Sequence, residues 1–165
     1  MNPISYWQRL KIAFQYVMPQ IYMTQAAGWL AKQKWGAVTH FVIKAFAKKY
    51  NIDMSIAEKE KFSDYASFNE FFIRPLKENA RPINQNPTAL CCPADGRVSE
   101  CGHIDDDRLL QAKGHFFSLN DLLAEDKDLT ETFKNGEFVT TYLSPRDYHR
   151  VHMPCDGTLR KMIYV

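Results

Sequence analysis

The chain has 165 residues, of which 45% are hydrophobic, so it is long enough to form one domain with a core and an appendage. Its four cysteines include no CxxC pair and two are adjacent, which argues against a disulfide framework and favours reduced thiols in the cytosol. We recognise no secretory signal, and no apolar run reaches the roughly 18 residues that a membrane-spanning helix needs.

Charge is distributed unevenly along the chain. Residues 1–52 contain seven Lys or Arg and no Asp or Glu, whereas the remaining residues carry fourteen basic and nineteen acidic side chains. The formal net charge of +2 therefore combines a basic head with a mildly acidic body. Nucleic-acid binding is not indicated, because the basic residues of the head alternate with apolar positions and no recognisable binding motif occurs.

Three amphipathic helices are expected in the head: one that ends before Pro19, one over about 20–33 and one over about 37–50. Two interpretations fit these basic, aromatic-rich helices: they pack on the body of their own protein, or they lie in a lipid interface. The expected apolar stripes are Tyr6, Leu10, Ala13, Phe14 and Val17 in the first helix, Ile21, Ala26, Trp29 and Leu30 in the second, and Val38, Phe41, Val42, Ala45 and Phe46 in the third.

A capping-box pattern, Ser67 to Glu70, predicts a short helix from Phe68 to Ile73 that stops before Pro75. The segment 74–82 is expected to be an extended connection that joins the helical head to a body of short strands.

The body contains the pattern P-x-D-G-x-[V/L] twice, at 93–98 and 154–159. Asp-Gly is a turn signal, so both copies are expected to begin strands. A helix through Leu122 and Leu123 is expected after the capping residue Ser118. The expected strands cover about 97–102, 108–113, 137–143, 148–153 and 157–165.

These patterns predict an α+β protein. The N-terminal amphipathic helices would precede a mostly antiparallel body, a β-sandwich or barrel-like hybrid with a short helix. The last residues form an apolar strand without a turn or a polar tail, so we expect this body to be incomplete at its C-terminus.

The segment YLSPRDYHRVHMP (142–154) carries the most chemistry. Ser144, Pro145 and Asp147 suit a helical turn between two strands. Residues three apart on a strand point to opposite faces, so His149 and His152 share a cleft only if one of them lies in the turn. They could equally be ordinary surface histidines. A metal site is not indicated, because there is no HExxH and no third nearby histidine.

Four segments closely resemble bacterial phosphatidylserine decarboxylase, in that family's order: FNEFFIRPLKENARPI (68–83), CPADGRV (92–98), QAKGHFFSL (111–119) and YLSPRDYHRVHMP (142–154). The resemblance implies an enzyme that converts phosphatidylserine to phosphatidylethanolamine and CO₂ through a pyruvoyl Schiff base. Loss of CO₂ leaves a carbanion, and the pyruvoyl carbonyl is the electron sink that this chemistry needs.

Site residues are implied by the same resemblance. Asp95 would orient a histidine, His152 would be the base that activates a serine, and His149 would bind substrate or manage its proton. Asp156, in the second copy of the repeat, is interpreted as a turn residue. A metal hydrolase that uses Asp95, His149 and His152 is a weaker alternative.

The family forms its pyruvoyl group by self-cleavage of the proenzyme at a serine in a Leu-Gly-Ser-Thr motif. None of the seven serines of this chain follows a glycine. We therefore expect a chain truncated before that serine and inactive alone, which would need a pyruvoyl-bearing smaller subunit as partner. A non-catalytic membrane-binding fragment is the alternative function.

The resemblance also implies where the protein works. Residues 1–60 would form a membrane-association region, and residues 61–165 part of the β-rich catalytic domain. The expected location is the cytoplasmic side of the bacterial cell membrane, where the head would meet phosphatidylserine and an anionic lipid surface. A homodimer is left open.

Overall fold

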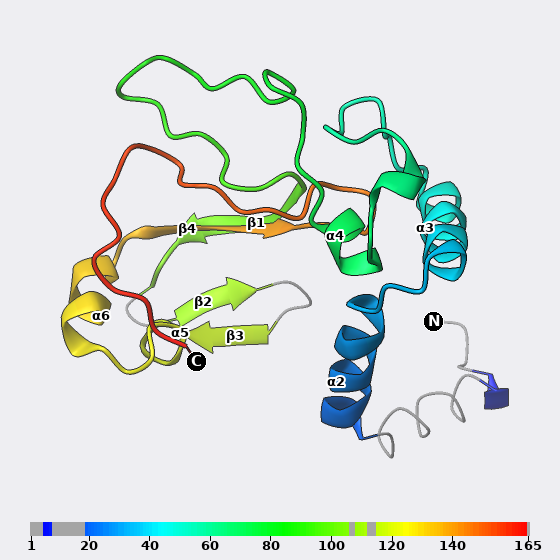
Figure 1. Ribbon diagram of the computed structural model, residues 1–165. Helices are drawn as coiled ribbons and strands as arrows, with labels where there is room; N and C mark the ends of the chain where they lie inside the picture. The colour runs from blue at the N-terminus through cyan, green and yellow to red at the C-terminus, as the bar shows by residue number, and fades with distance from the viewer. Residues whose placement is uncertain (1–4, 8–18, 106–107, 112–114, 165) are drawn as a thin grey trace.

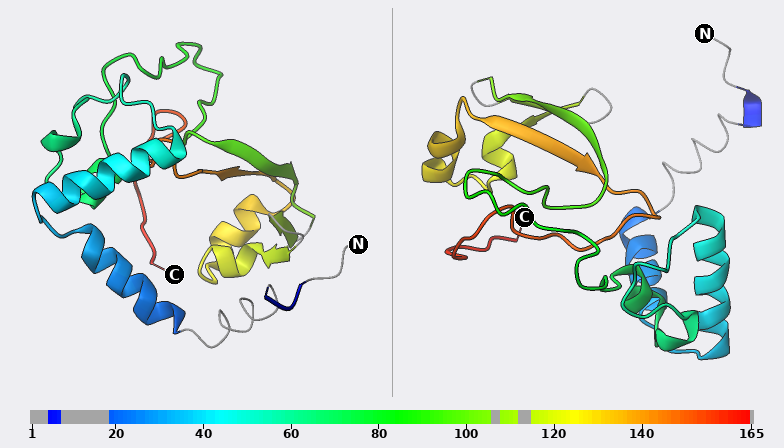
Figure 2. Two further views of the ribbon diagram at one scale, coloured as in Figure 1. Left: turned by 90° about the vertical axis from the view of Figure 1, so that its right-hand side faces the viewer. Right: turned by 90° about the horizontal axis from the view of Figure 1, so that it is seen from above.

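The computed structural model describes residues 5–7, 19–105, 108–111 and 115–164. Helices α2 to α4 lie at one end of the molecule and the strands at the other (Figures 1 and 2). Except for Tyr6, the apolar stripe predicted for the first helix lies outside the described residues.

The head contains the helices α2 (Gln20–Ala31), α3 (Ala37–Tyr50), η1 (Phe62–Asp64) and α4 (Phe68–Phe72). Helix α3 ends at Asn51, which adopts the left-handed conformation that commonly terminates helices. Ser67 caps α4 by accepting a hydrogen bond from the Glu70 N–H at 3.2 Å, as the capping box predicted. The helices predicted at about 20–33, 37–50 and 68–73 are therefore confirmed, with α2 ending two residues earlier than predicted.

An aromatic cluster forms the core of the head. Ile43 and Ala47 of α3 are buried against Tyr65 and against Phe71 of α4. Phe46, Phe62 and Phe68 pack around them, mostly with rings edge to face, an arrangement that adds to the hydrophobic stabilisation.

The apolar stripe predicted for α3 is mostly exposed, although its Phe46 packs on the core. The buried residues of this helix are Thr39, Ile43 and Ala47, whereas Val38 and Phe41 are exposed. Helix α3 carries apolar residues around most of its circumference, so periodicity alone did not identify the side that meets α4.

The body has two separate two-stranded antiparallel sheets. In the first, β1 (Arg97–His103) pairs with β4 (Glu137–Tyr142); in the second, β2 (Arg108–Gln111) pairs with β3 (His115–Ser118). Helices α5 (Leu119–Leu122) and α6 (Lys127–Phe133) lie between β3 and β4 in the sequence. A small core forms between Ile104 and Leu119.

The predictions for the body are confirmed only in part. The described residues contain two small sheets and no sandwich or barrel, and neither 148–153 nor 157–164 is a strand. These segments have strand-like side-chain patterns but lack a continuous backbone partner, and a strand needs one to form a ladder. Strand β3 and helix α6 were not predicted.

Candidate active site

Two sequence motifs that lie far apart in the chain run side by side. The backbone N–H of His152 donates to the carbonyl of Pro93 at 2.8 Å, and the N–H of Cys91 donates to the carbonyl of Pro154 at 2.8 Å. These two bonds tie the segment that precedes Asp95 to the segment that contains both predicted site histidines.

Gly96 fixes the position of Asp95. A Cβ at residue 96 would lie 2.5 Å from the carbonyl oxygen of Tyr142 and 2.9 Å from a methyl group of Thr141, closer than real Cβ atoms approach other atoms. Only glycine therefore allows β1 to begin at this distance from the end of β4. The second Asp-Gly, at 156–157, also forms a bend, but no strand follows it within the described residues.

Arg81 holds the carboxylate of Asp95. Its Nε lies 2.9 Å from both carboxylate oxygens, and its Nη2 also donates to Oδ2. The hydrogen bond to Asp95 raises the pKa of Arg81, while partial burial acts in the opposite direction. The sequence interpretation assigned Arg81 to a connecting segment, so this fork-like contact was missed.

A reverse turn precedes the histidines. The N–H of Asp147 donates to the carbonyl of Ser144 at 2.9 Å, and the Asp147 carboxylate accepts from both the N–H and the hydroxyl of Ser144 at 2.7 Å. Burial acts to raise the pKa of Asp147, but these bonds, with Arg146 and His149, outweigh it and leave the pKa below its ordinary value. The predicted turn is present, but it is not helical.

His149 lies against helix α4. Its ring stacks on Phe72, with centroids 4.0 Å apart and an angle of 25° between the planes. Nε2 is 2.9 Å from the carbonyl oxygen of Ser144, and because a carbonyl only accepts, we assign a proton to Nε2. In the neutral ring, Nδ1 is then the atom able to accept a proton.

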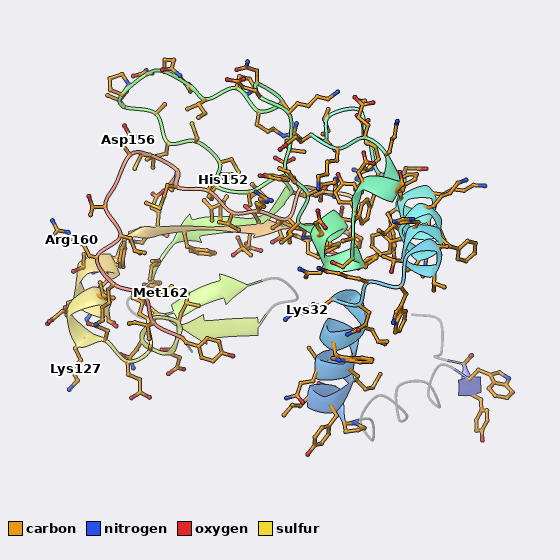
Figure 3. The ribbon with its side chains drawn as sticks, viewed as in Figure 1. Lys32, Lys127, His152, Asp156, Arg160 and Met162 are labelled. Carbon is orange, nitrogen blue, oxygen red and sulfur yellow. The ribbon has the colours of Figure 1, made fainter. Side chains whose placement is uncertain are left out.

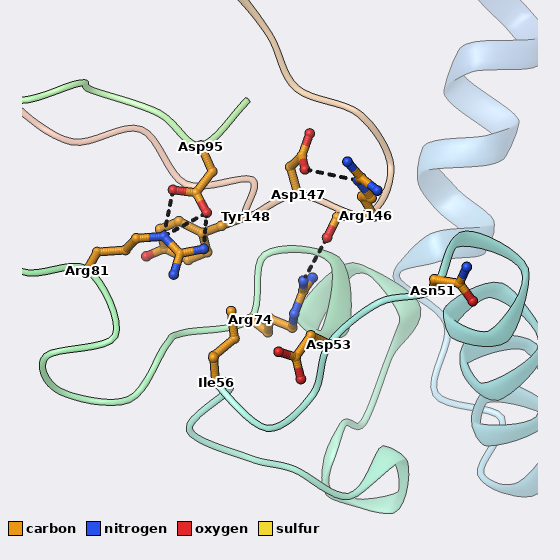
Figure 4. Close-up of a pocket in the computed structure, with 9 residues that line it drawn as sticks. All are labelled: Asn51, Asp53, Ile56, Arg74, Arg81, Asp95, Arg146, Asp147 and Tyr148. Carbon is orange, nitrogen blue, oxygen red and sulfur yellow. Dashed lines mark hydrogen bonds and ion pairs between the residues drawn. The ribbon is translucent and has the colours of Figure 1, made fainter. Parts of the chain in front are cut away.

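His152 is linked to Tyr148. Nε2 of His152 is 3.0 Å from the Tyr148 hydroxyl, and the two rings stack with centroids 5.5 Å apart. Tyr148 is buried, and it lines a cavity of about 390 Å³ together with Asp95 (Figure 4). Figure 3 shows His152 nearer to the helical head than Asp156, which lies further along the same segment.

The structure thus brings the backbone segments of Asp95 and His152 together, but their side chains have different partners. Asp95 bonds to Arg81, and His152 bonds to Tyr148. No hydrogen bond joins the two side chains within the part of the chain that the structure describes. That Asp95 and His152 act on one reacting group stays a prediction.

Other residues of this region were not predicted from the sequence. Tyr148 and Arg74 also line the cavity, and Arg74 is 2% exposed. The local sequence gives no signal that Arg74 is buried, because arginine is mostly exposed in folded proteins.

Known proteins match this chain closely. Residues 68–165 match the family model of phosphatidylserine decarboxylase, and residues 10–51 match a second model described as PSD. A phosphatidylserine decarboxylase proenzyme of Haemophilus influenzae is 88% identical over 165 residues, which are 100% of this chain and 57% of the relative. The proenzymes of Pasteurella multocida and Mannheimia succiniciproducens are 78% and 76% identical over 162 residues, 98% of this chain and 55% of each relative.

The chain therefore spans a little over half the length of these relatives. The first family match covers more than half of the chain and includes Asp95, His149 and His152. On these grounds the chain belongs to the phosphatidylserine decarboxylase family.

Proposed function

We propose that this chain forms the part of a phosphatidylserine decarboxylase that contains Asp95, His149 and His152. The complete enzyme would convert phosphatidylserine to phosphatidylethanolamine and CO₂. The observation that carries the proposal is the pair of backbone bonds that hold the two motif segments, 91–95 and 148–154, side by side.

The family uses a pyruvoyl group, which would supply the electron sink that loss of CO₂ requires. The residues present fit the formation of such a group from a serine. His152 offers an exposed imidazole that can take a hydroxyl proton, and Asp95 is a nearby carboxylate already fixed by Arg81. The serine would lie outside the 165 residues.

The contacts of the two histidines support the roles that the resemblance implies. His152 would act as the base, and its bond to Tyr148 would hold the ring in place. His149 would face the substrate, because its Nε2 is committed to the Ser144 carbonyl and Nδ1 remains to accept or return a proton. The stack of His149 on Phe72 would fix that orientation.

The head supports a membrane-associated role. No residue of α2 is buried, and its exposed side chains include Ile21, Tyr22 and Trp29. Exposed aromatic residues next to lysines suit the interface of an anionic membrane. Among the described residues, no helix is long and apolar enough to cross a bilayer. We propose that residues 1–60 associate peripherally with the cytoplasmic face of the cell membrane.

The body supports a protein partner. Val98, Val139 and Met153 are exposed, as are several apolar residues between 159 and 164. Exposed apolar residues in such number are typical of a surface that another protein element covers. The pyruvoyl-bearing smaller subunit is the proposed occupant.

A chimera tests the catalytic proposal. These 165 residues are joined to the part of the Haemophilus influenzae relative that the match does not cover, and the chimera is produced in a bacterium that lacks phosphatidylserine decarboxylase. We expect phosphatidylethanolamine to accumulate at the expense of phosphatidylserine. A well-expressed chimera that forms none, beside an active natural relative, would contradict the proposal.

Vesicle flotation tests the membrane proposal separately. The chain should float with anionic vesicles and float less with purely zwitterionic ones, because lysines of the head meet anionic lipid. Replacement of Trp29 by Ala should weaken flotation, whereas replacement of the exposed Phe133 of α6 by Ala should not. Flotation that depends on neither the lipid charge nor Trp29 would argue against this surface.

A further inference from the structure

The cavity beside Asp95 is lined by an arginine, Arg74, whose charge has no carboxylate partner among the described residues. Six charged residues line this cavity, three arginines and three aspartates: Arg74, Arg81, Arg146, Asp53, Asp95 and Asp147 (Figure 4). Equal numbers of the two charges suggest complete pairing, but the contacts show otherwise.

Two of the arginines have a carboxylate partner. Arg81 binds Asp95 at 2.9 Å through Nε, and Arg146 lies 3.8 Å from Asp147. The third aspartate, Asp53, accepts from the N–H and the hydroxyl of Ser55 at 2.9 Å and 2.7 Å.

Arg74 has no carboxylate partner among the described residues. Its Nη2 donates to the carbonyl of Arg146 at 3.3 Å, and its Nε and Nη1 are buried without a hydrogen-bond partner in the described part of the chain. The Phe71 ring, 5.5 Å from the guanidinium carbon, gives a weaker electrostatic contact. Burial lowers the pKa of Arg74, which reflects the same loss of hydration.

A buried guanidinium with two unsatisfied donors is costly, and each such group in a natural protein calls for an explanation, of which a bound ion or ligand is one. An oxyanion supplies both the missing charge and the missing acceptors. The bond from Nη2 to Arg146 is long for an N–H···O bond, so little is lost when the guanidinium turns toward the cavity.

We propose that this cavity is a phosphate site with Arg74 as its anchor. A phosphate monoester or diester offers several oxygens to the arginine fork, and the cavity of about 390 Å³ exceeds what a carboxylate needs. The site borders Asp95, so the phosphate of a lipid headgroup bound here would lie next to the candidate active site. The identification with a headgroup, though not the phosphate site itself, rests on the proposed function.

Calorimetric titration of the 165-residue chain tests the site without any decarboxylation. The probes are inorganic phosphate and glycerophosphoserine, and L-serine is the competitor that has a carboxylate but no phosphate. We expect both phosphate probes to bind and L-serine not to compete. Replacement of Arg74 by Met should weaken binding by about tenfold or more, since a charge-assisted contact is lost.

Two variants separate a ligand anchor from a structural arginine. Arg74→Lys keeps the charge but lacks the fork, and should retain part of the affinity for phosphate. Arg160→Met, an exposed arginine outside the cavity, should leave the affinity unchanged. Without ligand, Arg74→Met should melt at the same temperature as the natural chain or higher, because an uncompensated buried charge is removed.

The outcomes are distinct. Binding of glycerophosphoserine alone would assign the site to a headgroup, and binding of both probes would assign it to phosphate in general. Binding of neither probe, or binding that Arg74→Met leaves intact, would overturn the proposal. An inactive chimera with intact, Arg74-dependent phosphate binding would instead contradict only the proposed function.

Discussion

The helical head and the strand-containing body differ in how completely they bury their apolar side chains. The head encloses a core in which Ile43, Tyr65 and Phe71 are completely buried. The body has a core of Ile104 and Leu119 and leaves apolar residues of β1 and β4, such as Val98 and Val139, exposed. Stability should therefore reside mainly in the head, whereas the body leaves apolar surface exposed.

The candidate site combines residues from both regions. The Asp95 segment comes from the body, and His149 stacks on Phe72 of the head. Arg150 adds a second link, since its Nε donates to the carbonyl of Ile73 at 2.7 Å. The most stable part of the molecule thus supports the residues that are expected to do the chemistry.

The largest effect is expected in the head core. Replacement of Phe71, which is 0% exposed, by Ala should lower the free energy of unfolding by about 3–5 kcal/mol, because it removes contacts and leaves a cavity. The matched change in the body, Val139→Ala on β4, should cost less than about 1 kcal/mol, since this side chain is exposed. Urea unfolding measures both, and equal losses would contradict the contrast between head and body.

The next largest effect is expected when either of two glycines is replaced by alanine, because the two changes should shift stability in opposite directions. Gly96→Ala should destabilise the protein by about 1–3 kcal/mol, because the methyl group would collide with the Tyr142 carbonyl. Gly28→Ala in α2 should stabilise it by about 0.5–1 kcal/mol, since nothing lies within 4 Å and alanine favours a helix. The same unfolding experiment decides, and a harmless Gly96→Ala would show that β1 and β4 approach less closely than described.

The smallest effect concerns pH. The pKa of Asp147 is lower in the folded protein than its ordinary value near 3.9, so its contribution to stability is complete above that value. The contribution is lost as the pH falls through the folded pKa. Asp147→Asn should therefore lose less stability than the natural chain on acidification below about pH 4. If the stability of the two proteins fell equally with pH, Asp147 would have no such pH-dependent contribution to stability.

The sequence was sufficient wherever a local signal determines the structure. Local signals predicted several elements that are present: the capping box at Ser67, the proline and glycine boundaries of α2 and α3, the Asp-Gly turn before β1, and the strand-forming residues of β4. The family resemblance was also confirmed by the comparisons.

The predictions from sequence failed where an element or a contact depends on residues far apart in the chain. The segments 148–153 and 157–164 were predicted as strands, but the local sequence does not show whether a neighbouring segment completes their hydrogen bonds. Helix α6 was missed because its seven residues include few apolar ones. The contacts of Arg81 with Asp95, across 14 residues, and of Arg74 with Arg146, across 72, are likewise invisible to local patterns.

The two copies of the Asp-Gly repeat offer the most direct test of the central claim, that Asp95 and His152 serve one reacting group. In the chimera with the Haemophilus influenzae relative, chain cleavage is followed by gel electrophoresis and mass spectrometry. Asp95→Asn and His152→Gln should both abolish cleavage, whereas the matched changes Asp156→Asn and His103→Gln should leave it intact. Normal cleavage in Asp95→Asn or in His152→Gln, with both control proteins also active, would contradict the account.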